Sequence, residues 1–160
     1  MENNDQLFRS VRSVYIALAA YVNKVGKEIG EEKALEYLSS SFAEIGEFQG
    51  KKLKRLLLES QKPNATEAFD LIKAVPFSIG INLMIPKKES DKVVARLDKC
   101  PIFECAKVVG IDPATFCDNT AVPYYDTIAK QLNMDLKFER NKIKSSPDDF
   151  CEEQLIDTSK

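Results

Sequence analysis

The residues of this sequence whose side chains can do covalent or metal chemistry are its four cysteines. They are Cys100, Cys105, Cys117 and Cys151, and all of them lie in the second half of the chain. The chain of 160 residues contains no histidine, so it lacks the usual general base near neutral pH and the commonest zinc ligand. Serine and cysteine mechanisms that depend on an imidazole are therefore excluded.

Cys100 is the cysteine best placed to react. It precedes Pro101, which fits the first position of a helix, and backbone N–H groups at a helix N-terminus carry partial positive charge. That charge, together with Lys99, should lower the pKa of the thiol. A thiolate here can attack an electrophilic carbon or ligate a soft metal. The alternative is that Cys100 only caps a helix at a strand–helix junction.

Two other cysteines stand beside acidic residues. Asp118 follows Cys117, and Cys151 lies in the acidic run over residues 148–153. Because a nearby carboxylate raises a thiol pKa, both should be poorer nucleophiles than Cys100. Asp118 can instead act as a base or position a water molecule, unless it is a solvated acid on a helix surface. The candidate catalytic residues are thus Cys100, Cys117 and Asp118.

The cysteines could also bind a metal ion together. Their spacing does not form paired C-x-x-C knuckles, yet distant thiolates can meet in space. A zinc or iron site built from Cys100, Cys105, Cys117 and Cys151 is therefore an alternative. The cofactor is otherwise unknown. A plainer interpretation is that some of these thiols are small buried hydrophobes.

Helices dominate the first half of the chain. Apolar residues at intervals of three and four predict a helix over residues 7–25, one bent helix or two helices over 34–57, and a short helix over 66–73. From Phe77 the period changes to two, which predicts a strand over 77–85. A polar turn over 86–90 and a strand over 93–97 would complete an antiparallel hairpin.

The second half mixes helices and strands. Pro101 and the Asp112-Pro113 pair predict two helix starts, and Pro123 should restart the second helix near Tyr124. Alternation predicts strands over 136–140 and 150–156. The expected fold is α+β, with N-terminal helices packed on a mainly antiparallel sheet and further helices inserted between strands. We expect a single domain over 1–160, with a helical half over 1–75 and a cysteine-bearing half over 76–156.

The composition restricts the partners. With 44% hydrophobic residues, 30% charged residues and a net charge of -2, the chain is typical of a globular domain without a global positive field. We therefore expect no nucleic-acid and no membrane partner, but a small-molecule ligand or substrate. The opening residues lack an apolar signal segment, which predicts a cytoplasmic protein with reduced thiols. The apolar helical positions make a homodimer a further expectation.

The order of these landmarks resembles the L-2-amino-thiazoline-4-carboxylic acid hydrolase-like family. The resemblance is carried by the hairpin, the Cys100-Pro101-Ile102-Phe103 helix start, Gly110, Phe116-Cys117-Asp118, the strand entry over 133–138 and Cys151. It implies hydrolytic opening of a thiazoline ring to N-carbamoyl-cysteine. It also implies that Cys100, Cys117 and Cys151 are the matching cysteines, while Cys105 is an extra one. The layout is distantly similar to the 4-vinyl-reductase-type small-molecule-binding domain as well.

Three hypotheses follow. In the first, Cys100 is the nucleophile or a metal ligand in the hydrolysis of a small ring with C–N and C–S bonds, Cys117 is its partner and Asp118 orients water. In the second, the chain is a sensor-like domain that binds a small ligand or a metal without turnover. In the third, it is a structural or interaction protein whose cysteines are core residues.

Overall fold

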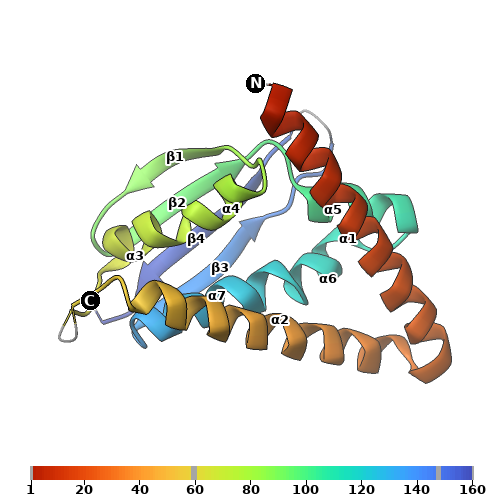
Figure 1. Ribbon diagram of the computed structural model, residues 1–160, viewed down its shortest axis with the longest axis horizontal. Helices are drawn as coiled ribbons and strands as arrows, with labels where there is room; N and C mark the ends of the chain where they lie inside the picture. Colours follow the sequence, from red (N-terminus) through yellow and green to blue (C-terminus); the bar gives the residue numbers. More distant parts are fainter. Residues whose placement is uncertain (1, 59–60, 147–148, 160) are drawn as a thin grey trace.

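A computed structural model describes residues 2–58, 61–146 and 149–159 of the chain (Figure 1). Its first half holds four helices, and in the second half three helices stand between two pairs of strands. In chain order the elements are α1 (Glu2–Ile29), α2 (Glu31–Lys54), α3 (Ala65–Ile72), α4 (Ala74–Ser78), β1 (Leu83–Lys88), β2 (Lys92–Leu97), α5 (Pro101–Val109), α6 (Pro113–Asp118), α7 (Ala121–Leu132), β3 (Leu136–Lys142) and β4 (Cys151–Asp157).

The sheet has the strand order β1-β2-β4-β3, and every neighbouring pair is antiparallel. Ala95 of β2 and Arg140 of β3 both pair with Glu153 of β4, so these three residues share one face. That face also carries the buried Val93 and Leu155, which belong to an apolar core shared with α3 and α7. Helices α3 and α4 lie over the sheet in Figure 1. The predicted α+β class, with helices on a mainly antiparallel sheet, is confirmed.

The two long N-terminal helices form a V. Gly30 joins them with a φ of 97°, a backbone conformation that favours glycine. Helix α1 crosses α5, where Arg12 donates to Glu104 over 3.0 Å. Helix α2 instead runs along α7 (Figure 1). Because each arm packs on a different helix, the two arms diverge from Gly30.

Close contact between α2 and α7 depends on two glycines. A Cβ at Gly46 would overlap the carbonyl oxygen of Tyr124, and a Cβ at Gly50 would come within 2.6 Å of the Cβ of Gln131. No larger residue fits at either position without a backbone shift. Both glycines therefore lie inside α2, which is a single helix where one bent helix or two helices were predicted.

The first strand differs from its prediction. Phe77 and Ser78 end helix α4, and the strand begins at Leu83. Pro76 lies in the first turn of α4, where a proline is tolerated, and its carbonyl accepts from the N–H of Ile81 over 3.0 Å. This local hydrogen bonding outweighs the alternating apolar pattern. The strand prediction was therefore wrong for residues 77–82.

The turn of the hairpin also lies later than predicted. Residues 86–88 belong to β1, and the turn is closed by the N–H of Glu89, which donates to the carbonyl of Lys92 over 2.9 Å. Pro86 can remain in the strand because β1 is at the sheet edge, and the register shifts between Met84 and Lys87. The antiparallel hairpin itself is confirmed.

The remaining predictions agree with the structure within a few residues. Asp112 caps α6 by accepting from the N–H of Thr115 over 2.8 Å. Pro123 lies in the first turn of α7, which restarts after α6 as predicted. Strands β3 and β4 occupy the two late alternating segments.

Substitution of Gly46 by alanine should lower the free energy of unfolding by about 1–3 kcal/mol, because the new methyl group overpacks the α2–α7 contact. Urea denaturation measures this change. Gly26→Ala is the matched control, since its Cβ meets no atom closer than 3.4 Å, and it should be neutral or stabilising within a helix. Equal stability of the two variants would contradict the proposed role of the close contact.

Candidate active site

A pocket of about 240 Å³ lies where α1, α2, α4 and α7 meet the sheet and the start of α5. Its walls are mostly apolar. One carboxyl, one thiol and three phenols are the polar groups among its described lining. The lining residues are Tyr15, Phe42, Ile45, Val75, Ile79, Ile81, Leu97, Cys100, Pro101, Ile102, Ala121, Tyr124, Tyr125 and Glu153.

Cys100 is the cysteine that lines this pocket. It is the N-cap of α5, and the N–H of Phe103 interacts with its sulfur, which favours the thiolate as predicted. The pKa of Cys100 is nevertheless raised well above its usual value, first by a hydrogen bond with Cys151 and then by burial. The prediction of a lowered Cys100 pKa was wrong, because these two effects raise the pKa more than the N–H groups of the helix N-terminus lower it.

The surroundings of this pair favour negative charge on Cys151. Its hydrogen bond with Cys100 lowers the pKa of Cys151 to about 7, against the opposing effect of burial. The N–H of Lys144 donates to its sulfur over 3.4 Å, and the cations of Lys144 and Arg140 favour the charge as well. The expectation that the acidic run would disfavour a thiolate at Cys151 was therefore wrong, since these donors face its sulfur.

The other two cysteines are held in the core. Burial raises the pKa of Cys117, and the charge of Glu153 adds to this effect. Burial also raises the pKa of Cys105 to about 12, and its thiol donates to the carbonyl of Ile102 over 3.1 Å. Both thiols are therefore protonated at neutral pH.

Asp118 forms an ion pair with Arg140. Two nitrogens of the guanidinium donate to its carboxylate over 2.6–3.1 Å. The Asp118 side chain is 51% exposed, whereas that of Arg140 is 16% exposed. The charge of Arg140 in turn acts on Cys117, Cys151 and Glu153. Asp118 thus holds the cation that faces the thiols.

Glu153 is the least expected member of the site. It lies on the core face of β4, and burial raises the pKa of its carboxyl to about 8, with Cys151 adding to the rise and Arg140 opposing it. In the part of the chain that the structure describes, no hydrogen bond or ion pair reaches this carboxyl. Glu153 is therefore largely protonated at neutral pH and faces the pocket.

Three tyrosines complete the polar lining. Burial raises the pKa of Tyr15 to about 12 and also raises the pKa values of Tyr124 and Tyr125. The Tyr125 ring packs against Phe138, with 5.1 Å between centroids. The phenols are therefore neutral and can donate hydrogen bonds to a bound molecule.

The predicted four-cysteine metal site is not found. Over residues 2–58, 61–146 and 149–159, no group of three or more histidine, cysteine, aspartate or glutamate residues is arranged to hold a metal ion. Cys105 bonds to its own helix, whereas Cys100 and Cys151 form a thiol pair. The zinc or iron alternative therefore has no support from the donor geometry.

The comparisons with known proteins identify the family. The model of the L-2-amino-thiazoline-4-carboxylic acid hydrolase family matches residues 10–153, which is most of the chain. The protein belongs to this family. No curated protein matches it. Among the described helices of this family member, none is both long and apolar enough to cross a lipid bilayer.

Sequence reasoning missed Glu153 and Arg140. A signal for Glu153 was present, because residues 151, 153 and 155 alternate and place it on the same face as Cys151 and Leu155. The acidic run around it suggested an exposed edge strand instead. Arg140 was counted as a strand residue, and nothing in its spacing indicated Asp118 as its partner.

The thiol pair predicts a pH-dependent absorbance. One thiolate should appear in the folded protein with a midpoint near pH 7, because the pKa of Cys151 is about 7. Thiolate absorbance at about 240 nm, followed by pH titration, measures it. Cys100→Ala should move the midpoint upward by removing the hydrogen bond, whereas Cys105→Ala should leave it in place. An unchanged midpoint in Cys100→Ala would show that the pair does not set the pKa.

Glu153 predicts a pH dependence of stability. Its pKa is raised to about 8 on folding, so the folded state binds more protons than the unfolded state and stability falls as pH rises toward 8. Between pH 5 and pH 7 this effect should lower the free energy of unfolding by about 2 kcal/mol relative to Glu153→Gln. Urea denaturation at several pH values measures the difference.

Glu152→Gln is the control for this experiment. Glu152 accepts from Arg96 over 2.8 Å, which lowers its pKa, and it lies on the opposite face of β4. The Glu152 carboxylate loses its stabilising effect only at lower pH. The free energy of unfolding of Glu152→Gln should therefore change between pH 5 and pH 7 as it does in the wild type. If the unfolding free energy of Glu153→Gln changes with pH as it does in the wild type, the Glu153 carboxyl of the wild type is ionised in the folded protein.

Proposed function

We propose that this protein hydrolyses a small ring that contains a C–N and a C–S bond, with the Cys100 pocket as its active site. Family membership supports the reaction type, a ring opening like that of a thiazoline. The observation that carries the proposal is that the Cys100 thiol and the Glu153 carboxyl line the same pocket. A nucleophile and a proton donor therefore face one bound molecule.

Cys100 is the nucleophile in this proposal. Its sulfur adds to the ring carbon bonded to both nitrogen and sulfur, and its proton passes to the Cys151 thiolate with which it is hydrogen-bonded. The pair thereby supplies a base without histidine, since the pKa of Cys151 is about 7. Phe103 N–H assists by favouring charge on the attacking sulfur.

Glu153 is the general acid and then the base. As the ring C–S bond breaks, the departing sulfur takes the proton of the Glu153 carboxyl, and the ring carbon stays attached to Cys100. A water molecule then adds to that carbon and gives a proton to the Glu153 carboxylate. The Cys100 sulfur leaves and regains its proton from Cys151, and the product carries a free thiol and a urea group. A pKa of about 8 suits both roles.

Arg140 and Asp118 position charge in this scheme. The guanidinium stabilises negative charge as it moves between Cys151 and Glu153, and the bidentate pair with Asp118 keeps it in place. Cys117 is an uncharged neighbour that excludes water from the sulfurs. Asp118 thus acts through Arg140 rather than on the substrate.

The test is turnover of 2-aminothiazolines, with the ring-opened urea quantified by mass spectrometry. Cys100→Ser should lower kcat by about a hundredfold or more, because a hydroxyl has no comparable nucleophilicity in the absence of a strong base. Cys105→Ser is the matched control and should retain wild-type kcat, since Cys105 lies outside the pocket lining. Wild-type turnover by Cys100→Ser, or binding of every compound without turnover, would overturn the proposed function.

A further inference from the structure

Two of the four cysteines lie in contact although they come from distant parts of the chain. The end of β2 pairs with the start of β4, where Leu97 stands opposite Cys151. Cys100 follows Leu97 by three residues and is the N-cap of α5. Its thiol is hydrogen-bonded to the sulfur of Cys151, and both cysteines are free and buried. The tertiary structure therefore brings together two free sulfurs from separate elements.

The two sulfurs of this pair differ in their surroundings. Cys100 lines the pocket of about 240 Å³, whereas Cys151 is not among the described lining residues and is 3% exposed. The N–H of Lys144 donates to the Cys151 sulfur over 3.4 Å, and the charge of Arg140 also favours a thiolate there. A reagent in the pocket therefore meets Cys100 first, and a nucleophilic sulfur lies behind it.

The other two cysteines do not share these properties. Cys105 donates to the carbonyl of Ile102 within its own helix over 3.1 Å. Cys117 lies near enough for its charge to act on Cys100, but burial raises the pKa of Cys117. Neither thiol is among the described residues that line the pocket. Both should therefore react slowly with a reagent that enters the pocket.

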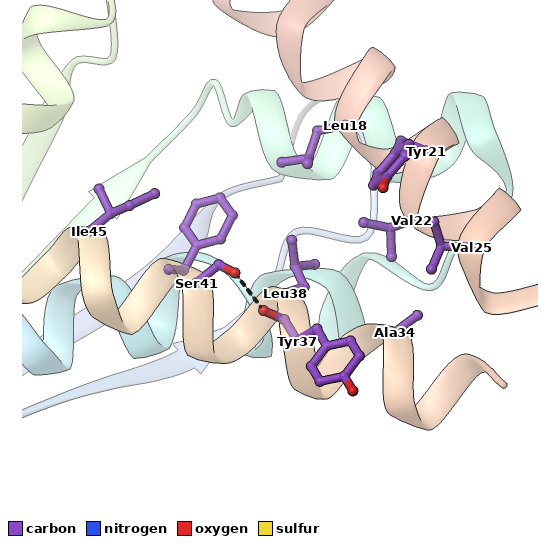
Figure 2. A pocket seen from close by; sticks show the side chains of 10 residues that line it. Leu18, Tyr21, Val22, Val25, Ala34, Tyr37, Leu38, Ser41 and Ile45 are labelled. Atoms are coloured by element: carbon purple, nitrogen blue, oxygen red, sulfur yellow. Dashed lines mark hydrogen bonds between the residues drawn. The ribbon is translucent and has the colours of Figure 1, made fainter. Parts of the chain in front are cut away.

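Solvent reaches the pocket by way of the space between the arms of the V. That space is a mostly apolar groove of about 380 Å³, and Figure 2 shows Leu18 of α1 facing Leu38 of α2 across it. Tyr21 lines the groove and is 68% exposed, so the groove is open to solvent. Phe42 and Ile45 line both the groove and the pocket. A small uncharged molecule such as hydrogen peroxide can therefore pass from solvent to Cys100.

We propose that Cys100 and Cys151 form a reversible oxidation site, at which a hydroperoxide in the pocket converts the two thiols into a disulfide. The two sulfurs are already within hydrogen-bonding distance of each other. The disulfide consumes both sulfurs that the proposed hydrolysis uses, so oxidation should stop turnover. Formation of the disulfide is independent of the proposed function, whereas the loss of turnover rests on it.

The oxidation has two steps. Cys100 passes its proton to Cys151 and attacks one oxygen of the hydroperoxide. The O–O bond breaks, Cys100 becomes a sulfenic acid, and the leaving alkoxide or hydroxide takes the proton from Cys151. The Cys151 thiolate then attacks the Cys100 sulfur and the S–O bond breaks. The departing hydroxide becomes water with the proton of the Glu153 carboxyl, which lines the same pocket. Two electrons pass from the sulfurs to the peroxide, and a dithiol reverses the reaction by exchange.

The experiment treats the purified protein with hydrogen peroxide at pH 7 and maps unreduced proteolytic peptides by mass spectrometry. The wild type should form a Cys100–Cys151 disulfide and should recover both free thiols in dithiothreitol. Cys105→Ser is the matched control and should form the same disulfide at a rate within about twofold of the wild type. A disulfide to Cys105 or Cys117, or oxidation of all four thiols at one rate, would overturn the proposal.

Two variants establish the order of the steps. Cys151→Ser should stop at a sulfenic acid on Cys100, which dimedone labels, because no second thiolate is present to attack it. Cys100→Ser should be oxidised at Cys151 about tenfold or more slowly than the wild type loses its thiols, because Cys151 lies behind the pocket wall. Equal dimedone labelling of the wild type and Cys151→Ser would contradict the assignment of Cys151 as the second nucleophile. The wild-type disulfide map tests the pair independently of how well either variant folds.

The outcomes separate this inference from the proposed function. A Cys100–Cys151 disulfide in a protein that turns over no 2-aminothiazoline would retain the oxidation site and overturn the hydrolase function. Turnover by the reduced protein, with no Cys100–Cys151 disulfide after peroxide, would overturn the oxidation site alone. Wild-type turnover by the mapped disulfide form would retain the site and exclude Cys100 as the nucleophile of the hydrolysis.

Discussion

The burial of one carboxyl on the apolar face of the sheet is the constraint on which the candidate site depends. Glu153 lies on the central strand β4, between Ala95 and Arg140 on the neighbouring strands. Low polarity around it raises its pKa to about 8, which is the property that the proposed function uses for a proton donor near neutral pH. In the proposed function, Glu153 thereby takes the part that histidine commonly has in proton transfer near neutral pH.

The surroundings of the thiol pair lower the pKa of Cys151, whereas those of Glu153 raise its pKa. Cys100 and Cys151 come from a helix start and a strand start that are far apart in the chain, and only one of the two carries the charge. The charge resides on Cys151 because the N–H of Lys144 and the nearby cations stabilise it there. Cys100 remains protonated and faces the pocket. In the proposed function, this difference makes Cys151 the base and Cys100 the nucleophile.

The V of α1 and α2 forms an apolar groove beside the Cys100 pocket. Gly46 and Gly50 bring α2 close to α7, while Arg12 ties α1 to α5. Because the arms are attached to different helices, apolar side chains between them are not fully buried against each other. The remaining apolar surface adjoins the Cys100 pocket, since Phe42 and Ile45 line both spaces.

Local patterns in the sequence determined the elements and the family. Periodicity located α1, α2, α3 and the strands β2, β3 and β4, whereas helix α4 was missed. Proline and capping residues located α5, α6 and α7; Asp112, for example, marked the start of α6 because capping depends on adjacent residues. The start of β1 was missed since the hydrogen bonds after Pro76 are a local alternative to a strand. Only the tertiary structure decided the direction of the pKa shifts of Cys100, Cys151 and Glu153. Those properties depend on burial and on charges such as Arg140, which adjacent residues do not encode.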